Sequence, residues 1–200
     1  MLKLAAIGLC AALVVGCDAA TRYGNVQQNV GADSSASART SAESCNGTLG
    51  AVSVEFVRVP QGATCTLNGT KVDGNVLVER DATLRSTNAR IGGNVQAENA
   101  ARTNVSGGSV GGSVQVKQGG ASSVTGVKIG GDIQFDEMTG ALVANSNTVT
   151  GSIQIVKNFG GVSVNTNRVN GNLQCKENSP APTGGGNIVQ GNKEDQCSAL

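Results

Sequence analysis

A short phrase that recurs at nearly constant spacing is the feature that most limits what this chain can fold into. Clear copies read IGGNVQA, VGGSVQV and IGGDIQF, and each contains a glycine followed by a polar residue and an apolar residue. These glycines are Gly74, Gly93, Gly112, Gly131, Gly151, Gly171 and Gly191, and they are separated by 19, 19, 19, 20, 20 and 20 residues. Such a period predicts a solenoid in which each repeat forms one coil.

Alternation of apolar and polar residues indicates that the coils are built from β-strands. Val114 and Val116 flank the polar Gln115, and this pattern recurs in the other copies. A period of two is typical of a strand with one buried face. A second inward pair is expected nine and seven residues before each glycine, as at Thr103 and Val105. Each coil therefore has at least two strands, and a third face is compatible with its length.

Glycines exclude a helical alternative. A glycine in every repeat leaves no long uninterrupted helical window, and β-branched residues dominate the apolar set. Turn residues such as Gly69 and Asn88 recur between the two inward pairs, where a sharp corner needs the left-handed conformation. We therefore predict an all-β fold, a single-stranded parallel β-helix (β-solenoid) with coils of 19–20 residues, whose handedness the sequence leaves open.

Composition limits the kinds of partner. The chain has 3 Phe, 1 Tyr and no Trp, which disfavours aromatic platforms for stacking sugars or bases. Its 15 Lys and Arg residues against 14 Asp and Glu give a net charge of +1, so no strong field attracts a polyanion over a distance. We expect no nucleic-acid partner.

The N-terminus predicts export. Residues 1–16 have a basic start and an apolar stretch too short to span a bilayer, as in a signal peptide. The segment Leu13-Val14-Val15-Gly16-Cys17 resembles the lipobox of bacterial lipoproteins, which implies a lipid attached to Cys17 and a membrane partner. The alternative is ordinary cleavage near Ala19 or Ala20 and secretion. Residues 17–44 are rich in Ser, Ala and Gly and are expected to form a flexible tether.

Four cysteines remain after the leader and Cys17. Cys45 and Cys65 are 20 residues apart, and Cys175 and Cys197 are 22 apart, so each pair is about one coil apart. Neighbouring coils lie at a spacing that accepts a disulfide, whereas the two pairs lie at opposite ends of the stack. We predict the disulfides Cys45–Cys65 and Cys175–Cys197, and a solenoid domain of about eight coils over residues 45–197, followed by a tail over 198–200.

Two outward rows are candidate contact surfaces. A row of amides can bind a polar glycan, although stacked glutamines also satisfy one another's hydrogen bonds; its members are Gln96, Gln115, Gln134, Gln154 and Gln174. A basic row can contact anionic polysaccharide, although it also suits a solvated face; its members are Lys71, Arg90, Lys128 and Arg168. The polar residue after each repeat glycine fits a ladder along a corner.

The sequence offers no catalytic constellation. Asp132, Asp136 and Glu137 fall in one coil, and we expect no basic or acidic counterpart at a matching offset in the neighbouring coils. Paired-carboxylate catalysis requires two carboxyl groups close together in different environments, and no such pair is evident. With no His and no C-x-x-C motif, we expect neither a metal site nor a cofactor. The protein is therefore expected not to be an enzyme.

The repeated phrase, together with the C-terminal block GNLQCKENSPAPTGGGNIVQGNKEDQC, resembles small exported bacterial β-solenoid lipoproteins of uncharacterised function. A more distant resemblance is to bactofilins, whose β-helices polymerise end to end. We expect a non-catalytic cell-envelope protein, on the periplasmic or surface face, that serves as an adhesion, glycan-contact or structural module. The alternatives are a small β-helical carbohydrate-active enzyme and a self-assembling scaffold, and a monomer is favoured.

Overall fold

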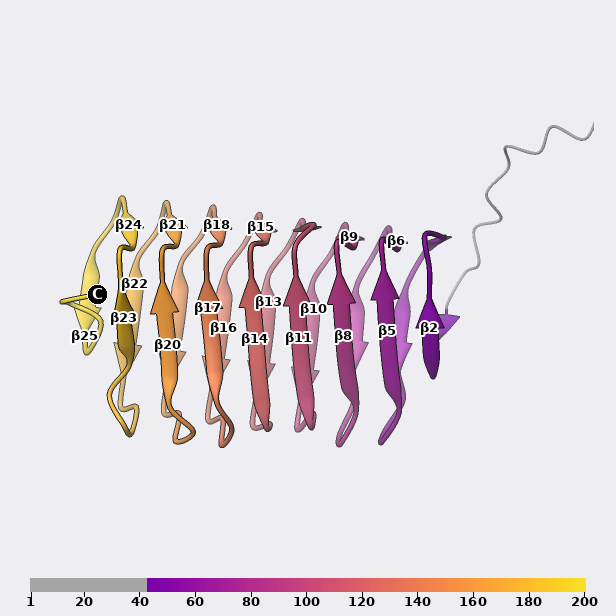
Figure 1. The fold of residues 1–200 in the computed structure, drawn as a ribbon, viewed down its shortest axis with the longest axis horizontal. Coiled ribbons are helices and arrows are strands. Elements are labelled where there is room, and N and C mark those ends of the chain that lie inside the picture. Colours follow the sequence, from indigo (N-terminus) through magenta and orange to yellow (C-terminus); the bar gives the residue numbers. More distant parts are fainter. Residues whose placement is uncertain (1–42) are drawn as a thin grey trace, which may run out of the picture. The chain divides into compact units, whose positions relative to one another are not determined.

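The computed structural model describes residues 43–200, which form a parallel β-solenoid of about eight turns with coils of about 19 residues (Figure 1). These residues contain strands and no helix. The predicted fold class is therefore confirmed. The predicted signal peptide, Cys17 and nearly all of the predicted tether lie outside the described residues.

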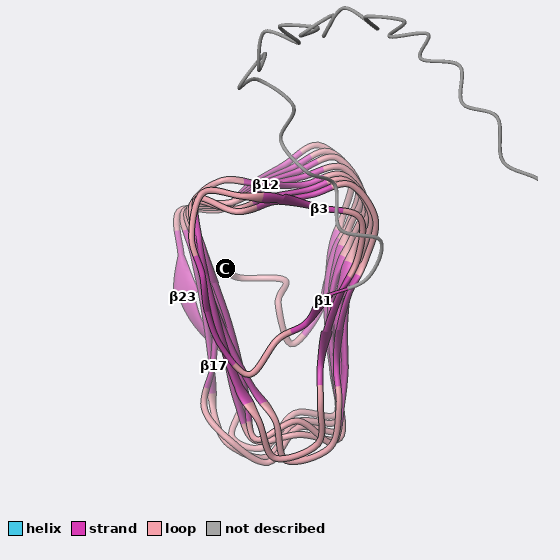
Figure 2. Cartoon of the chain, turned by 90° about the vertical axis from the view of Figure 1, so that its right-hand side faces the viewer, coloured by secondary structure: helices cyan, strands magenta, loops and turns pink. Residues whose placement is uncertain are grey.

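Three parallel sheets wrap around one core (Figure 2). Sheet A consists of β3 (Ser53–Val54), β6 (Lys71–Val72), β9 (Arg90–Ile91), β12 (Ser109–Val110), β15 (Lys128–Ile129), β18 (Thr148–Val149), β21 (Arg168–Val169) and β24 (Ile188–Val189). Sheet B consists of β1 (Glu43–Ser44), β4 (Val57–Val59), β7 (Val76–Val78), β10 (Val95–Glu98), β13 (Val114–Lys117), β16 (Ile133–Asp136), β19 (Ile153–Val156), β22 (Leu173–Lys176) and β25 (Lys193–Asp195). Sheet C consists of β2 (Gly47–Leu49), β5 (Thr64–Asn68), β8 (Thr83–Thr87), β11 (Arg102–Ser106), β14 (Ala121–Thr125), β17 (Leu142–Asn145), β20 (Val162–Asn165) and β23 (Thr183–Gly185).

Equivalent positions of the repeat lie directly over one another. Val114 pairs with Ile133, which pairs with Ile153, and Gln115 pairs with Gln134. Ile133 and Phe135 are fully buried, while Gln134 between them is partly exposed. The second inward pairs, such as Thr103 and Val105, are also buried. The predicted register of sheets B and C is confirmed.

The length of the coil changes at one corner. In the 19-residue coils Gly119-Gly120-Ala121 leads from sheet B into sheet C, and in the next coil Met138-Thr139-Gly140-Ala141 takes its place. The extra residue therefore extends this corner and leaves the three strands of each coil aligned with their neighbours. At the corner between sheets C and A, left-handed φ values of 66° at Gly69, 51° at Asn88 and 58° at Ser146 agree with the predicted turns.

Both ends of the solenoid carry a disulfide. Cys45 and Cys65 are joined with their Cα atoms 5.4 Å apart, and Cys175 and Cys197 with theirs 5.1 Å apart. The first strand, β1, already begins at Glu43, and Leu200 packs against the core at the other end. Each bridge therefore ties a terminal coil to its neighbour.

Candidate functional site

Sheet B presents the predicted row of glutamines on its outer face. Three hydrogen bonds run along the row, because Gln96 Nε2 donates to Gln115 Oε1 at 3.2 Å, Gln115 to Gln134 at 2.9 Å and Gln134 to Gln154 at 3.2 Å. Gln174 continues the register beside Gln154. Each bond orders a long side chain that would otherwise rotate freely, so the amides form a fixed ladder.

The glutamine ladder lines a groove, called here the glutamine groove. One part has a volume of about 450 Å³, and Leu77, Gln96, Gln115 and Gln134 line it. A smaller part of about 250 Å³ shares Gln134 with the first and extends to Gln154. Because the two parts share Gln134 and Asp136, the ladder lines a depression that crosses several coils.

Charged residues border the glutamine groove on one side. Glu98, Lys117 and Asp136 occupy equivalent positions in consecutive coils, two residues after the glutamines. Lys117 Nζ lies 3.6 Å from Asp136 Oδ2, and both side chains are more than one third exposed. An exposed pair of this kind stabilises the fold little, and Glu98 leaves this border with one negative charge in excess.

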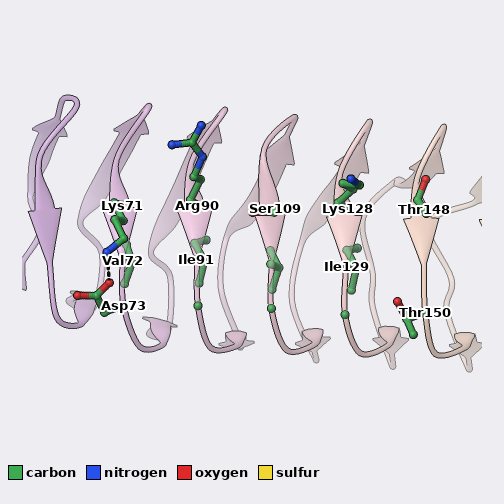
Figure 3. A pocket seen from close by; sticks show the side chains of 14 residues that line it. Lys71, Val72, Asp73, Arg90, Ile91, Ser109, Lys128, Ile129, Thr148 and Thr150 are labelled. Atoms are coloured by element: carbon green, nitrogen blue, oxygen red, sulfur yellow. Dashed lines mark ion pairs between the residues drawn. The ribbon is translucent and has the colours of Figure 1, made fainter.

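A second groove lies on the outer face of sheet A. It is called here the glycine groove, because Gly92, Gly111 and Gly130 line it. Its volume is about 450 Å³. Figure 3 shows the outward residues of consecutive strands in one row, from Lys71 through Arg90, Ser109 and Lys128 to Thr148. Three of the four predicted basic residues therefore line one depression, whereas Arg168 belongs to the same row but lies outside it.

The polar residues that follow the repeat glycines form a hydrogen-bonded ladder along the corner between sheets A and B. Except in the last coil, the side-chain oxygen accepts a hydrogen bond from the backbone N–H of its counterpart in the next coil; the Asn94 N–H, for example, donates to Asn75 Oδ1 at 2.7 Å. The ladder comprises Asn75, Asn94, Ser113, Asp132, Ser152, Asn172 and Asn192. The geometry gives these residues a structural role.

The three acidic residues considered for catalysis each have a partner within the fold. Asp132 accepts the Ser152 N–H at 2.7 Å. Asp136 pairs in register with Lys117 and faces its ammonium group, so the expectation of no basic counterpart at a matching offset is wrong for Asp136. Glu137 accepts a hydrogen bond from Gln118 at 2.7 Å. Each carboxylate is therefore accounted for by a structural interaction with the neighbouring coil.

Sequence reasoning missed two buried asparagine ladders in the 20-residue coils. The larger one comprises Asn147, Asn167 and Asn187 at the corner between sheets C and A, and the smaller one Asn158 and Asn178 at the corner between sheets B and C. Their recurrence at a spacing of 20 residues was the available signal. An asparagine near a turn looks the same in sequence whether it points inward or outward, so the buried role was not evident.

Residues 43–200 contain no group of three or more His, Cys, Asp or Glu side chains that could hold a metal ion. Over the same residues, no helix is long and apolar enough to cross a membrane.

Comparisons with protein-family models, with curated proteins and with solved structures found no match for this chain.

Proposed function

We propose that this protein is a non-catalytic module of the bacterial cell envelope that contacts glycan through the glutamine groove. The supporting observation is the hydrogen-bonded ladder from Gln96 to Gln154, which lines that groove. A row of fixed amides at the coil spacing suits a ligand that is itself linear and repetitive.

The amides of the ladder retain hydrogen-bonding capacity. A carboxamide offers two N–H donors and two acceptor lone pairs, and the ladder engages one donor and one lone pair of Gln115 and of Gln134. The remaining donor and lone pair of each can reach a sugar hydroxyl, which both donates and accepts. Because the side chains are already ordered, a ligand would bind them at little further entropic cost.

Export and tethering complete the proposal. Two disulfides in the fold are compatible with an oxidising, exported location. A lipid on Cys17 would attach the chain to a membrane, and the segment over residues 17–44 would separate the solenoid from it. The periplasmic and outer faces of the envelope are the places where such a module would meet polysaccharide.

A binding comparison tests the proposed contact. Peptidoglycan pull-down and a glycan array are run with the wild-type protein and with the triple variant Gln115→Ala, Gln134→Ala, Gln154→Ala, which should lose most of its binding. The control variant Thr64→Ala, Thr87→Ala, Ser106→Ala removes three exposed polar side chains from sheet C and should bind as wild type does. Equal binding by both variants would remove the ladder from consideration, and new reducing ends in the glycan would favour an enzyme.

The mass of the mature protein tests the anchor. A lipid attached to Cys17 should give a mass above that of the polypeptide, and Cys17→Ser should abolish the difference. A mature N-terminus at Ala20 or beyond would instead indicate a secreted protein.

A further inference from the structure

The floor of the glycine groove is bare backbone. Gly92, Gly111 and Gly130 occupy equivalent places in three consecutive coils, two residues after the outward residue of each strand of sheet A. The following coils have Thr150 and then Asn170 at that place, so side chains end the bare floor after Gly130. The bare part of the floor is therefore confined to the 19-residue coils, whereas the groove itself extends to Thr148 and Thr150 in the first 20-residue coil.

Basic side chains lie along the edge of this floor. Lys71 at one end is already neutralised, because its Nζ lies 2.6 Å from Asp73 Oδ1 (Figure 3). Arg90 and Lys128 are exposed and make no ion pair or side-chain hydrogen bond with the described part of the chain. Ser109 lies between them in the same row and also lines the groove. The middle of the groove therefore has two cations without an anionic partner.

The spacing of these cations is set by the solenoid. Strands of neighbouring coils lie about 4.8 Å apart, so Arg90 and Lys128, two coils apart, are separated by roughly 10 Å along the stack. We infer that the glycine groove binds an anionic polysaccharide, an extended chain that lies along the stack and places successive carboxylates or sulfates beside Arg90 and Lys128. Gly92, Gly111 and Gly130 have no side chain that would obstruct the sugar rings, and the arginine fork suits a planar carboxylate in particular.

An acidic peptide fits this groove less well. Extended peptides gain affinity by adding to the edge of a sheet, where backbone groups are free. Here the floor is the face of sheet A, and its amides are already bonded along the stack, as from Gly111 N to Ile91 O at 2.8 Å and from Gly130 N to Val110 O at 2.9 Å. The groove offers charges and hydroxyls but no backbone ladder, which favours a polysaccharide.

This inference does not rest on the proposed function of the glutamine groove, which lies on another sheet. Titration calorimetry of the purified full-length protein with polygalacturonate, a carboxylated polysaccharide, is the direct test. Binding should weaken as salt rises, because exposed charges are screened over about 8 Å at physiological ionic strength. Uncharged dextran should not bind, and dextran sulfate shows whether sulfate replaces carboxylate.

Matched variants locate the site. Arg90→Gln with Lys128→Gln should raise the Kd for polygalacturonate by about tenfold, the order expected for losing two exposed charge contacts. Arg85→Gln with Arg102→Gln removes the same charge from exposed positions on sheet C, outside the groove, and should change the Kd less than about twofold. Ser109→Glu should abolish binding and Ser109→Gln should not, and thermal melts should show all four variants folded.

The outcomes separate the alternatives. Equal losses from the two charge-removing pairs, or no binding by the wild-type protein, would overturn the inference. Poly-glutamate binding as tightly as polygalacturonate, with the same dependence on Arg90 and Lys128, would also overturn it by assigning the groove to an acidic peptide. The triple glutamine variant should bind polygalacturonate normally, so failure of one groove is distinguishable from failure of the other.

Discussion

The early, 19-residue coils and the later, 20-residue coils share strands and register but treat buried polar groups differently. In the early coils, Ser86 and Thr103 point into the core from sheet C, and their hydroxyl oxygens have no hydrogen-bond partner. In the later coils the equivalent positions of sheet C are apolar, as at Leu142 and Val162, and the buried polar groups are corner asparagines.

The corner asparagines are fully engaged. Asn167 Oδ1 accepts from Asn147 N and Asn147 Nδ2, both at 3.0 Å, and Asn167 Nδ2 donates to Ala144 O at 2.6 Å and to Asn187 Oδ1 at 2.9 Å. A buried polar group costs free energy unless it is bonded. The unbonded hydroxyls of Ser86 and Thr103 are therefore expected to weaken the early coils, and the bonded asparagine carboxamides to strengthen the later ones. Whether a buried polar side chain stabilises or destabilises the fold therefore depends on whether it has a hydrogen-bond partner.

The largest expected effect is at the junction of the two kinds of coil. Ile133 is fully buried. It pairs with Val114, which lies 19 residues earlier in the chain, and with Ile153, which lies 20 residues later. Ile133→Asp should lower the free energy of unfolding by about 4 kcal/mol or more, because the carboxylate would have neither partner nor water. The neighbouring Gln134→Asp should cost about 1 kcal/mol or less in the same denaturant melts. Comparable losses would show that inward and outward directions are misassigned by one residue.

Removing one asparagine tests the later coils directly. Asn167→Ala deletes four hydrogen bonds and leaves the Ala144 carbonyl and the Asn147 N–H buried without the Asn167 side chain as partner. We therefore expect the free energy of unfolding to fall by about 3 kcal/mol. Asn170→Ala, an exposed position in the same coil, is the control and should change stability by less than about 0.5 kcal/mol. Similar values from urea unfolding of both variants would contradict a stabilising role for the ladder.

Removing each disulfide compares the two ends. The bridges close loops with sequence separations of 20 and 22 residues. The loop-entropy account therefore gives nearly the same loss for each, about 3 kcal/mol. Calorimetric melts of Cys45→Ser with Cys65→Ser, and of Cys175→Ser with Cys197→Ser, should show similar falls in Tm. A fall in Tm for only one of the two variants would mean that the other end of the solenoid is held by its packing and does not need its disulfide.

The smallest expected effect has the opposite sign. Thr103→Val replaces an unpartnered buried hydroxyl by a methyl group of similar size, so it should stabilise the early coils by about 1 kcal/mol. Thr87→Val at an exposed position of the neighbouring strand controls for the change in β-propensity and should do less. Destabilisation by Thr103→Val would show that the hydroxyl is satisfied, for example by a buried water.

The repeat and the alternation within it were sufficient to predict the coil, the inward rows of sheets B and C and the pairing of cysteines one coil apart. These properties are local or follow from the period. The inward direction of Ile133 is set by its place in a strand, and the approach of Cys45 to Cys65 by the length of one coil. Strand periodicity is preserved wherever a strand forms, so the sequence alone determines it.

The buried direction of the corner asparagines and the two outer grooves were decided by the tertiary structure. Whether Asn167 points inward depends on the acceptor that Ala144 offers from the coil before, and no periodicity within one coil encodes that contact. The glycine groove likewise needs the third sheet, which places Arg90 and Lys128 along a bare floor and leaves Arg168, in the same row, outside it. Corners and grooves are formed by side chains from different coils, so their geometry exists only once the coils are stacked.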